Sequence, residues 1–112
     1  LPRLEYDFGL ATCEPGARTS AFQWDYPNGW APLHFIAVHG LLRYGYRAEA
    51  ERIARKYIHA IDRTFAETGT LWEKYNVTDG TLNVTDEYKM PPMLGWTAGV
   101  YVDFTTLLAP NG

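Results

Sequence analysis

The chain has 112 residues, 46% of them hydrophobic and 15% aromatic, which suits one domain with a packed core and argues against disorder. Its formal net charge of −3 comes from interleaved acidic and basic residues, and no basic stripe indicates a nucleic-acid partner. The single Cys13 excludes an internal disulfide, and no run reaches the ~18 apolar residues of a membrane-spanning helix.

Irregular structure is expected over residues 1–32. Prolines and glycines recur through this segment without any sustained hydrophobic period. It ends in QWDYPNGWAP, residues 23–32, which places two tryptophans, a carboxylate and an amide among rigid turn residues. Because a long segment without regular structure in a compact domain is usually functional, we interpret this one as a functional loop.

A first helix is predicted from about residue 33 to residue 44. Apolar and small residues recur there at helical spacing, and Gly45 marks the end. We expect the following residues to form its buried face: Leu33, Ile36, Ala37, Gly40, Leu41 and Tyr44.

A second, stronger helix is predicted from about Arg47 to Glu67, with Gly69 as its stop. The short link to the first helix predicts an antiparallel hairpin. Its apolar stripe is expected to contain Ala50, Ile53, Ala54, Tyr57, Ile58, Ile61 and Phe65.

Residues 70–94 are again expected to be irregular, and a third helix is predicted to begin near Trp96. Its sequence, WTAGVYVDFTTLL, is apolar on more than one side, as though further neighbours cover it. No strand period of any length is visible. We therefore predict an all-α fold that is part of something larger, with these residues of the third helix turned inward: Val100, Phe104, Leu107 and Leu108.

Three carboxylates lie in aromatic surroundings in the predicted loops: Asp25, Glu73 and Glu87. Aromatic neighbours desolvate a carboxyl group, which suits it for proton transfer. A pair of carboxyl groups facing each other across a sugar ring is what glycoside hydrolysis requires. The alternative is structural: Asp25 or Glu87 caps a turn, and Glu73 pairs on the surface with Lys74 or an arginine.

The loop residues near Asp25 also suit sugar recognition. Trp24 and Trp30 can stack on the apolar face of a sugar, while Gln23 and Asn28 can bond its hydroxyl groups.

Other kinds of site find little support. His34 and His39 are five residues apart on one helix and do not share a face, so we predict no metal site and interpret the histidines as core or surface residues. Nothing in the sequence implies a cofactor. Two N-x-T triplets, at Asn76 and Asn83, match the glycan-acceptor pattern, and we interpret both as chance matches.

The stretch QWDYPNGWAP closely resembles the second diagnostic motif of the trehalases, glycoside hydrolase family 37. The preceding FGLATCEPG is similar to a Gly-x-x-Thr segment of that family. WEKYNV, residues 72–77, is similar to the family's Glu-Lys-Tyr-Asp/Asn-Val. EYKMPPMLGWTAGV, residues 87–100, is similar to its Glu-Tyr…Gly-Trp-Thr-Asn-Gly-Val. The resemblance covers essentially the whole chain and corresponds to the C-terminal fifth or quarter of a trehalase.

This resemblance implies that residues 1–112 form the C-terminal helices and active-site loops of an (α/α)6 barrel, without separate domains. It also implies hydrolysis of α,α-trehalose to two glucoses with inversion of configuration. By the same resemblance Glu73 is the general base, Glu87 contacts the sugar, and Trp24 forms an aromatic wall of the pocket. The wall is completed, or its loop is held, by Gln23, Asp25 and Trp30.

Several family features lie outside this chain or differ within it. The family's general-acid aspartate, first motif and arginine cluster belong to earlier segments, so the remainder of the catalytic domain is an expected partner. We expect this chain alone to be inactive and poorly folded. DGTLNVTD replaces a glycine-rich run and MPPML replaces a polar-aromatic stretch, so the loop over the pocket is expected to differ in shape.

Two other functions remain open at this point. A related α-glucosidase on the same barrel, acting on another disaccharide, keeps Glu73 but has a different pocket, and a panel of sugars distinguishes it. A non-catalytic carbohydrate-binding remnant binds sugar without turnover and tolerates Glu73→Gln.

Overall fold

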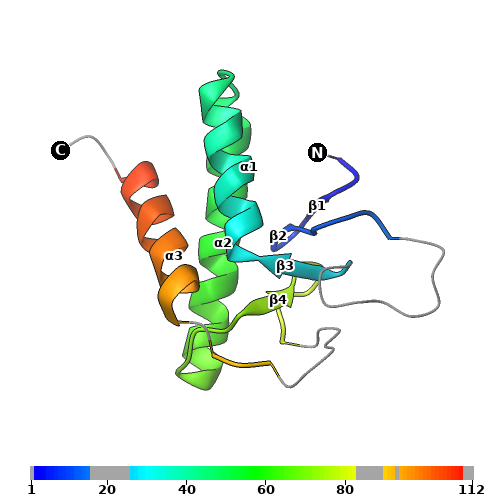
Figure 1. The fold of residues 1–112 in the computed structure, drawn as a ribbon, viewed down its shortest axis with the longest axis vertical. Coiled ribbons are helices and arrows are strands. Elements are labelled where there is room, and N and C mark those ends of the chain that lie inside the picture. Colours follow the sequence, from blue (N-terminus) through cyan, green and yellow to red (C-terminus); the bar gives the residue numbers. More distant parts are fainter. Residues whose placement is uncertain (1, 16–25, 83–89, 93, 110–112) are drawn as a thin grey trace.

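The computed structural model describes residues 2–15, 26–82, 90–92 and 94–109 (Figure 1). Within these residues it is mostly helical, with two small sheets beside the helices. The helices are α1 (Ala31–Arg43), α2 (Arg47–Thr68) and α3 (Leu94–Leu108). The strands are β1 (Glu5–Tyr6), β2 (Gly9–Leu10), β3 (Asn28–Trp30) and β4 (Lys74–Asn76).

The three predicted helices are confirmed close to their expected bounds. A proline in the first turn starts α1, where its missing N–H costs nothing. Gly69 ends α2 in the left-handed conformation, with φ of 72°, and its N–H donates to the Phe65 carbonyl at 2.7 Å. Figure 1 shows that α1 and α2 lie side by side and run in opposite directions, as the short link between them predicts.

The face that α1 buries differs from the prediction. Its buried residues are Ala31, His34 and Val38, whereas Ile36 is 66% exposed and Tyr44 80% exposed. Much of the expected apolar stripe instead lines an open groove of about 330 Å³ on the outside of the helix. The predicted stripe is therefore only partly buried. Ala37 and Leu41 pack against the core, while Ile36 lines a second open groove beside Trp96 of α3.

The core is centred on α2, as the strength of its apolar stripe predicts. Ile53, Tyr57 and Phe104 are each at most 1% exposed, and the Tyr57 ring meets the Phe104 ring edge-on at 5.3 Å. At the end of α2 the prediction fails, because Phe65 is 52% exposed while Thr64 is buried in its place. On α3, Val100 and Phe104 point inward as expected.

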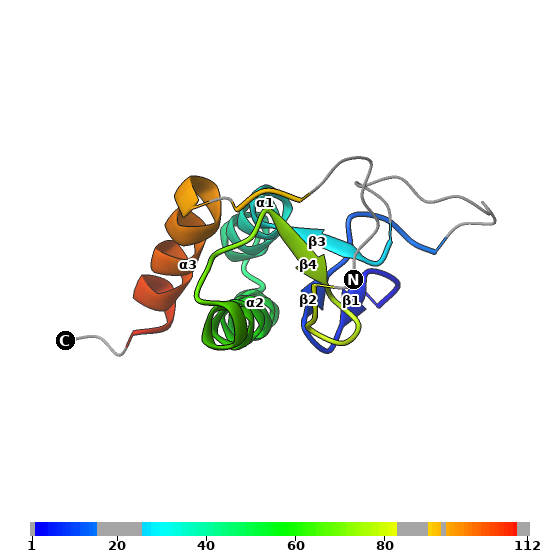
Figure 2. The ribbon, with the colours of Figure 1, turned by 90° about the horizontal axis from the view of Figure 1, so that it is seen from below.

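The two sheets were not predicted by the all-α interpretation. Strands β1 and β2 pair as a short antiparallel hairpin, and β3 pairs with β4 so that Trp30 lies opposite Lys74. Figures 1 and 2 show both sheets on the same side of the α1–α2 hairpin, with α3 on the other side. Strands of two or three residues are too short to show a period. Because β3 and β4 are far apart in the chain, no local pattern predicts that they pair.

No helix in the described ranges is long and apolar enough to cross a membrane.

Candidate active site

Glu73 lies in the connection between α2 and β4, one residue before the strand begins. Its side chain is buried, with 5% of its surface exposed, and its N–H donates to the Pro91 carbonyl at 3.4 Å. The next contact of this segment is an antiparallel bridge between Trp72 and Pro92. Residues 72–73 therefore lie against residues 91–92, which brings together two parts of the chain that sequence analysis treats as one irregular segment.

The carboxylate of Glu73 pairs with the ammonium group of Lys74. Lys74 Nζ lies 3.0 Å from Glu73 Oε1, and the Lys74 side chain has no exposed surface. The Lys74 cation also lies over the Trp30 ring, 5.1 Å from its centroid, which is within the range of a cation–π contact. The structural alternative named Lys74 as a surface partner of Glu73; the pairing is present, but it is buried.

Trp30 connects this pair to the helices. It ends β3 and precedes the first residue of α1, and only 1% of its surface is exposed. The Trp96 ring, at the start of α3, meets it edge-on at 5.9 Å. Thr97 Oγ1 then donates to the Trp72 carbonyl at 2.7 Å. Trp30 is thus packed from two sides, and α1, α3 and β4 all contribute to its surroundings.

Four of the predicted site residues lie outside the described residues: Gln23, Trp24, Asp25 and Glu87. The two that the structure describes, Trp30 and Glu73, are brought together through Lys74.

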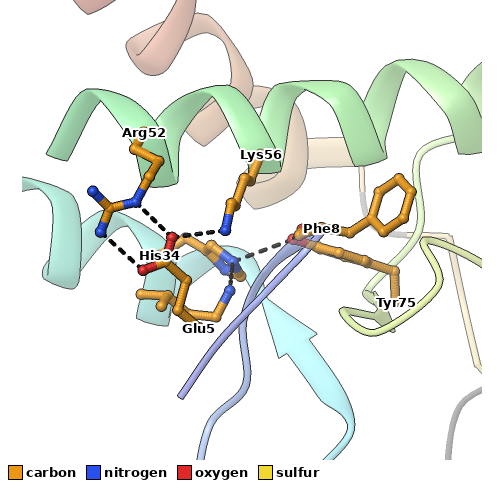
Figure 3. A network of polar contacts seen from close by, with 7 residues as sticks. Glu5, Phe8, His34, Arg52, Lys56 and Tyr75 are labelled. Atoms are coloured by element: carbon orange, nitrogen blue, oxygen red, sulfur yellow. Dashed lines mark hydrogen bonds and ion pairs between the residues drawn. The ribbon is translucent and has the colours of Figure 1, made fainter. Parts of the chain in front are cut away.

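His34, on the buried face of α1, makes contacts with three strands (Figure 3). Its Nδ1–H donates to the Trp30 carbonyl at 2.8 Å, and its Nε2 accepts from the Leu10 N–H at 2.9 Å. The Tyr75 hydroxyl lies 3.2 Å from the same Nε2 and donates to the Phe8 carbonyl at 2.6 Å. These five residues, called the His34 cluster below, hold β2, β3 and β4 in place against α1.

Burial sets the protonation of the His34 cluster. The imidazole is completely buried, and desolvation lowers the pKa of His34 to about 4, so the ring is neutral at neutral pH. Burial raises the pKa of Tyr75, so its hydroxyl keeps the proton that it donates to Phe8. The prediction that His34 is a core imidazole rather than a metal ligand agrees with these contacts.

A second polar group holds the β1–β2 hairpin on α2 (Figure 3). Arg52 Nε donates to Glu5 Oε2 at 2.7 Å, and Arg52 Nη2 donates to Glu5 Oε1 at 2.9 Å. Lys56 Nζ lies 2.7 Å from Glu5 Oε2. These hydrogen bonds, led by that of Arg52, lower the pKa of Glu5 to about 2. The hairpin is therefore tied to α2 by a charged clamp.

Gly9 allows the close approach that the His34 cluster needs. Its φ is 135°, and a Cβ added there would collide with the Tyr75 hydroxyl and with His34 Nε2.

We expect Gly9→Ala to lower the free energy of unfolding by roughly 2–4 kcal/mol, because it combines backbone strain with overpacking. Urea unfolding of the longer enzyme that contains this chain measures this. The matched control is Gly40→Ala in α1, where an added Cβ meets nothing within 4 Å. This control is expected to stabilise by about 0.5–1 kcal/mol, and equal midpoints for the two variants would contradict the tight packing at Gly9.

The remaining histidines and the candidate glycan acceptor have structural contacts. His39 bonds Asp103 at 2.5 Å and so links α1 to α3, while His59 is exposed on α2. Among the described residues, no group of three or more metal-ligating side chains comes together. Asn76 is 7% exposed, and its Oδ1 accepts from the Thr78 N–H at 2.9 Å, which agrees with a chance match to the glycan pattern. Asn83 lies outside the described residues.

Sequence reasoning missed two residues that the structure places beside the predicted site. Lys74 is named in the sequence analysis only as a surface partner of Glu73, because a lysine next to a glutamate is usually a solvated surface pair. Trp96 was used only to mark the start of a helix. Trp30 opposite Lys74 and Trp96 against Trp30 are contacts between residues far apart in the chain, and no local pattern reveals them.

Comparisons with known proteins agree with the motifs. The sequence model of the family described as Trehalase matches residues 3–109. The periplasmic trehalase of Pseudomonas aeruginosa is 39% identical over 104 residues, which are 92% of this chain and 18% of that protein. The periplasmic trehalase of Xanthomonas axonopodis pv. citri is 43% identical over 93 residues, 82% of this chain and 16% of that protein.

Among solved structures, neutral trehalase from Saccharomyces cerevisiae matches with a TM-score of 0.79 and 33% sequence identity. The match covers 96% of this chain and 19% of that one. The chain thus spans less than a fifth of the length of these relatives. Since the family model covers nearly all of its residues, the chain belongs to the trehalase family.

Proposed function

We propose that this chain is the C-terminal part of an enzyme that hydrolyses α,α-trehalose to two glucoses with inversion, and that it supplies the general base and part of the sugar pocket. The observation that carries the proposal is the match to the trehalase family over residues 3–109. The likeness in structure to a solved neutral trehalase over 96% of the chain supports it.

In the proposed reaction Glu73 is the general base. Its carboxylate takes a proton from a water molecule, whose oxygen attacks the anomeric carbon of one glucose. The bond from that carbon to the bridging oxygen breaks, and an aspartate on another segment of the enzyme gives the leaving sugar its proton. The buried position of Glu73, with its paired cation, supports this role because a general base must be held in one geometry away from bulk solvent.

The sugar pocket is assigned to the loops around Glu73. We propose that Trp24 stacks on a sugar ring and that Glu87 contacts its hydroxyl groups, with Gln23 and Asp25 completing the same wall. The role of Trp30 is to hold the loop from beneath, because its side chain is packed against Lys74 and Trp96 and has 1% of its surface exposed.

The proposed architecture is that residues 1–112 belong to a larger (α/α)6 barrel domain. The exposed apolar residues of α1 support this, because Phe35 is 42% exposed and Ile36 66% exposed on a helix that already packs against the described core. Trp96 gives a second indication. In the part of the chain that the structure describes, its Nε1–H is buried without an acceptor, and a further segment of the domain can provide one.

The stereochemistry of the product tests the reaction. Proton NMR of the enzyme with α,α-trehalose is expected to show equal amounts of α- and β-glucose at early times, because water inverts one ring and the other leaves unchanged. The protein to use is the longer enzyme that contains this chain, and the control is a trehalose solution without enzyme. Release of α-glucose alone would indicate retention and contradict Glu73 as a general base.

The two other functions predict different results in the same experiment. A related α-glucosidase releases no glucose from trehalose but acts on another disaccharide in a panel. A carbohydrate-binding remnant releases nothing from any member of the panel and still binds sugar.

A further inference from the structure

Lys74 is a fully buried cation, which is a costly feature for a protein to maintain. Its side chain has no exposed surface, and a buried ammonium group loses its hydration. An apolar side chain of the same length would fill this space without that loss. Because burial of an ion pair is weak evidence for stability, its presence beside the proposed base suggests a role in the chemistry.

The backbone is arranged so that Lys74 can reach its neighbour. Successive side chains in a strand point to opposite faces, so residues 73 and 74 would normally point apart. Here Glu73 precedes β4 and its N–H bonds Pro91, while Lys74 is the first residue of the strand and pairs with Trp30 of β3. Because Glu73 lies outside the strand, its side chain need not follow the alternation of β4, and Nζ comes within 3.0 Å of Oε1.

We propose that Lys74 is a positioning residue for the proposed hydrolysis: its Nζ holds Oε1 of Glu73 and thereby orients the carboxylate toward the attacking water. This inference rests on the proposed function of Glu73. A carboxylate has about four lone-pair positions on its two oxygens, and the bond from Lys74 uses only part of this capacity. Loss of the Lys74 bond removes one restraint on rotation of the carboxylate about its terminal bond, and a general base that rotates reaches the water in only part of its orientations.

Trp30 completes the arrangement by giving the Lys74 ammonium group a second contact beside Glu73. The ring lies 5.1 Å from Nζ and is itself packed against Trp96. A lysine has several rotatable bonds, and the ring and the carboxylate together hold its ammonium group in place. The contacts thus run without a break from α3 to the proposed base: Trp96 touches Trp30, Trp30 touches Lys74, and Lys74 pairs with Glu73.

The test is Lys74→Met in the longer enzyme that contains this chain, which keeps the length of the side chain and removes its charge. We expect kcat to fall roughly 10- to 100-fold while KM changes by less than about threefold, since Lys74 acts on the base and not on the substrate. Lys74→Gln retains an N–H donor and is expected to lose only roughly 3- to 10-fold in kcat. The matched control is Lys56→Met, which also removes the charge of a glutamate-paired lysine but does so at the β1–β2 hairpin. Its kcat is expected to stay within about twofold of the unchanged enzyme.

Thermal unfolding of each variant separates a positioning role from a structural one. A lower melting temperature with unchanged kcat per folded molecule overturns the proposal, and so does a rise in KM with unchanged kcat. If Lys74→Met does not fold, Lys74→Gln provides the comparison, and failure of both to fold would make Lys74 a structural residue only. An unchanged enzyme that leaves trehalose intact refutes the proposed function instead. A hydrolase that loses activity with Glu73→Gln but not with Lys74→Met keeps the function and refutes only the role of Lys74.

Discussion

Replacing Glu73 with glutamine is expected to lower kcat for trehalose by about 10²- to 10⁴-fold, the contribution usual for a general base. Glutamine has the size of glutamate and can still accept a hydrogen bond from Lys74, but it cannot take a proton from water. KM is expected to change little, because the loss arises in the transition state and not in substrate binding. Initial rates of glucose release over a range of trehalose concentrations measure both constants.

The control for this experiment is Glu67→Gln. Glu67 is also on the α2 side of the molecule and also pairs with a cation, Arg63, but its side chain is 59% exposed. We expect wild-type kcat from it. A Glu73→Gln enzyme that retains more than a tenth of the wild-type kcat would contradict the assignment of Glu73 as the base. Circular dichroism is needed beside the rates, because glutamine leaves the Lys74 charge without its anionic partner.

Acid is expected to destabilise the protein through His34 at a pH where most carboxyl groups are still charged. Burial lowers the pKa of His34 to about 4 from its ordinary value of 6.5, so the unfolded chain binds the extra proton more readily. Stability is therefore complete above about pH 6.5 and falls as the pH approaches 4. The shift corresponds to about 3 kcal/mol of unfolding free energy. Protonation also converts Nε2 from an acceptor into a donor facing the Leu10 N–H, which removes a hydrogen bond from the cluster.

Urea unfolding of the longer enzyme that contains this chain, at a series of pH values, tests this in the wild type and in His34→Gln. The variant is expected to be less stable at pH 7, since its single amide cannot reproduce both imidazole contacts, but to show a flatter dependence between pH 6.5 and 4. His59→Gln is the control, because His59 is exposed on α2 and touches the cluster through an edge-on ring contact with Phe8 at 5.5 Å rather than through a hydrogen bond to His34. An equally steep dependence in His34→Gln would show that another group is responsible.

A second acid-sensitive contact is expected to act at lower pH. Because Arg52 and Lys56 lower the pKa of Glu5 to about 2, its contribution is present above about pH 4.5 and is lost as the pH falls toward 2. The His34 and Glu5 effects thus fall in different pH ranges, which allows one titration of stability to separate the cluster at α1 from the clamp at α2.

The His34 cluster and the Glu73–Lys74 pair meet at the β3–β4 pairing. His34 bonds the Trp30 carbonyl and lies beside the Tyr75 hydroxyl. The Trp30 ring in turn contacts Lys74, which pairs with Glu73. A disturbance of His34 is therefore expected to reach the proposed base through these two strands.

The helices could be read from the sequence because their signals are local. The apolar period of residues 47–67, with Gly45 and Gly69 at the neighbouring ends, lies within the segment that folds, and the structure follows it closely. The motif around Glu73 could likewise be found in a single stretch. Both depend on neighbours within a few positions along the chain.

Local patterns in the sequence predict the helices of the described residues, with their order and approximate ends, and the residues of the trehalase motifs. Only the folded chain shows which residues of α1 are buried, that Asn28–Trp30 pairs with Lys74–Asn76, and that Lys74 is enclosed with Glu73 instead of lying on the surface. The physical reason is that a helix forms by hydrogen bonds four residues apart, whereas burial and strand pairing depend on which distant segments come to lie against a residue.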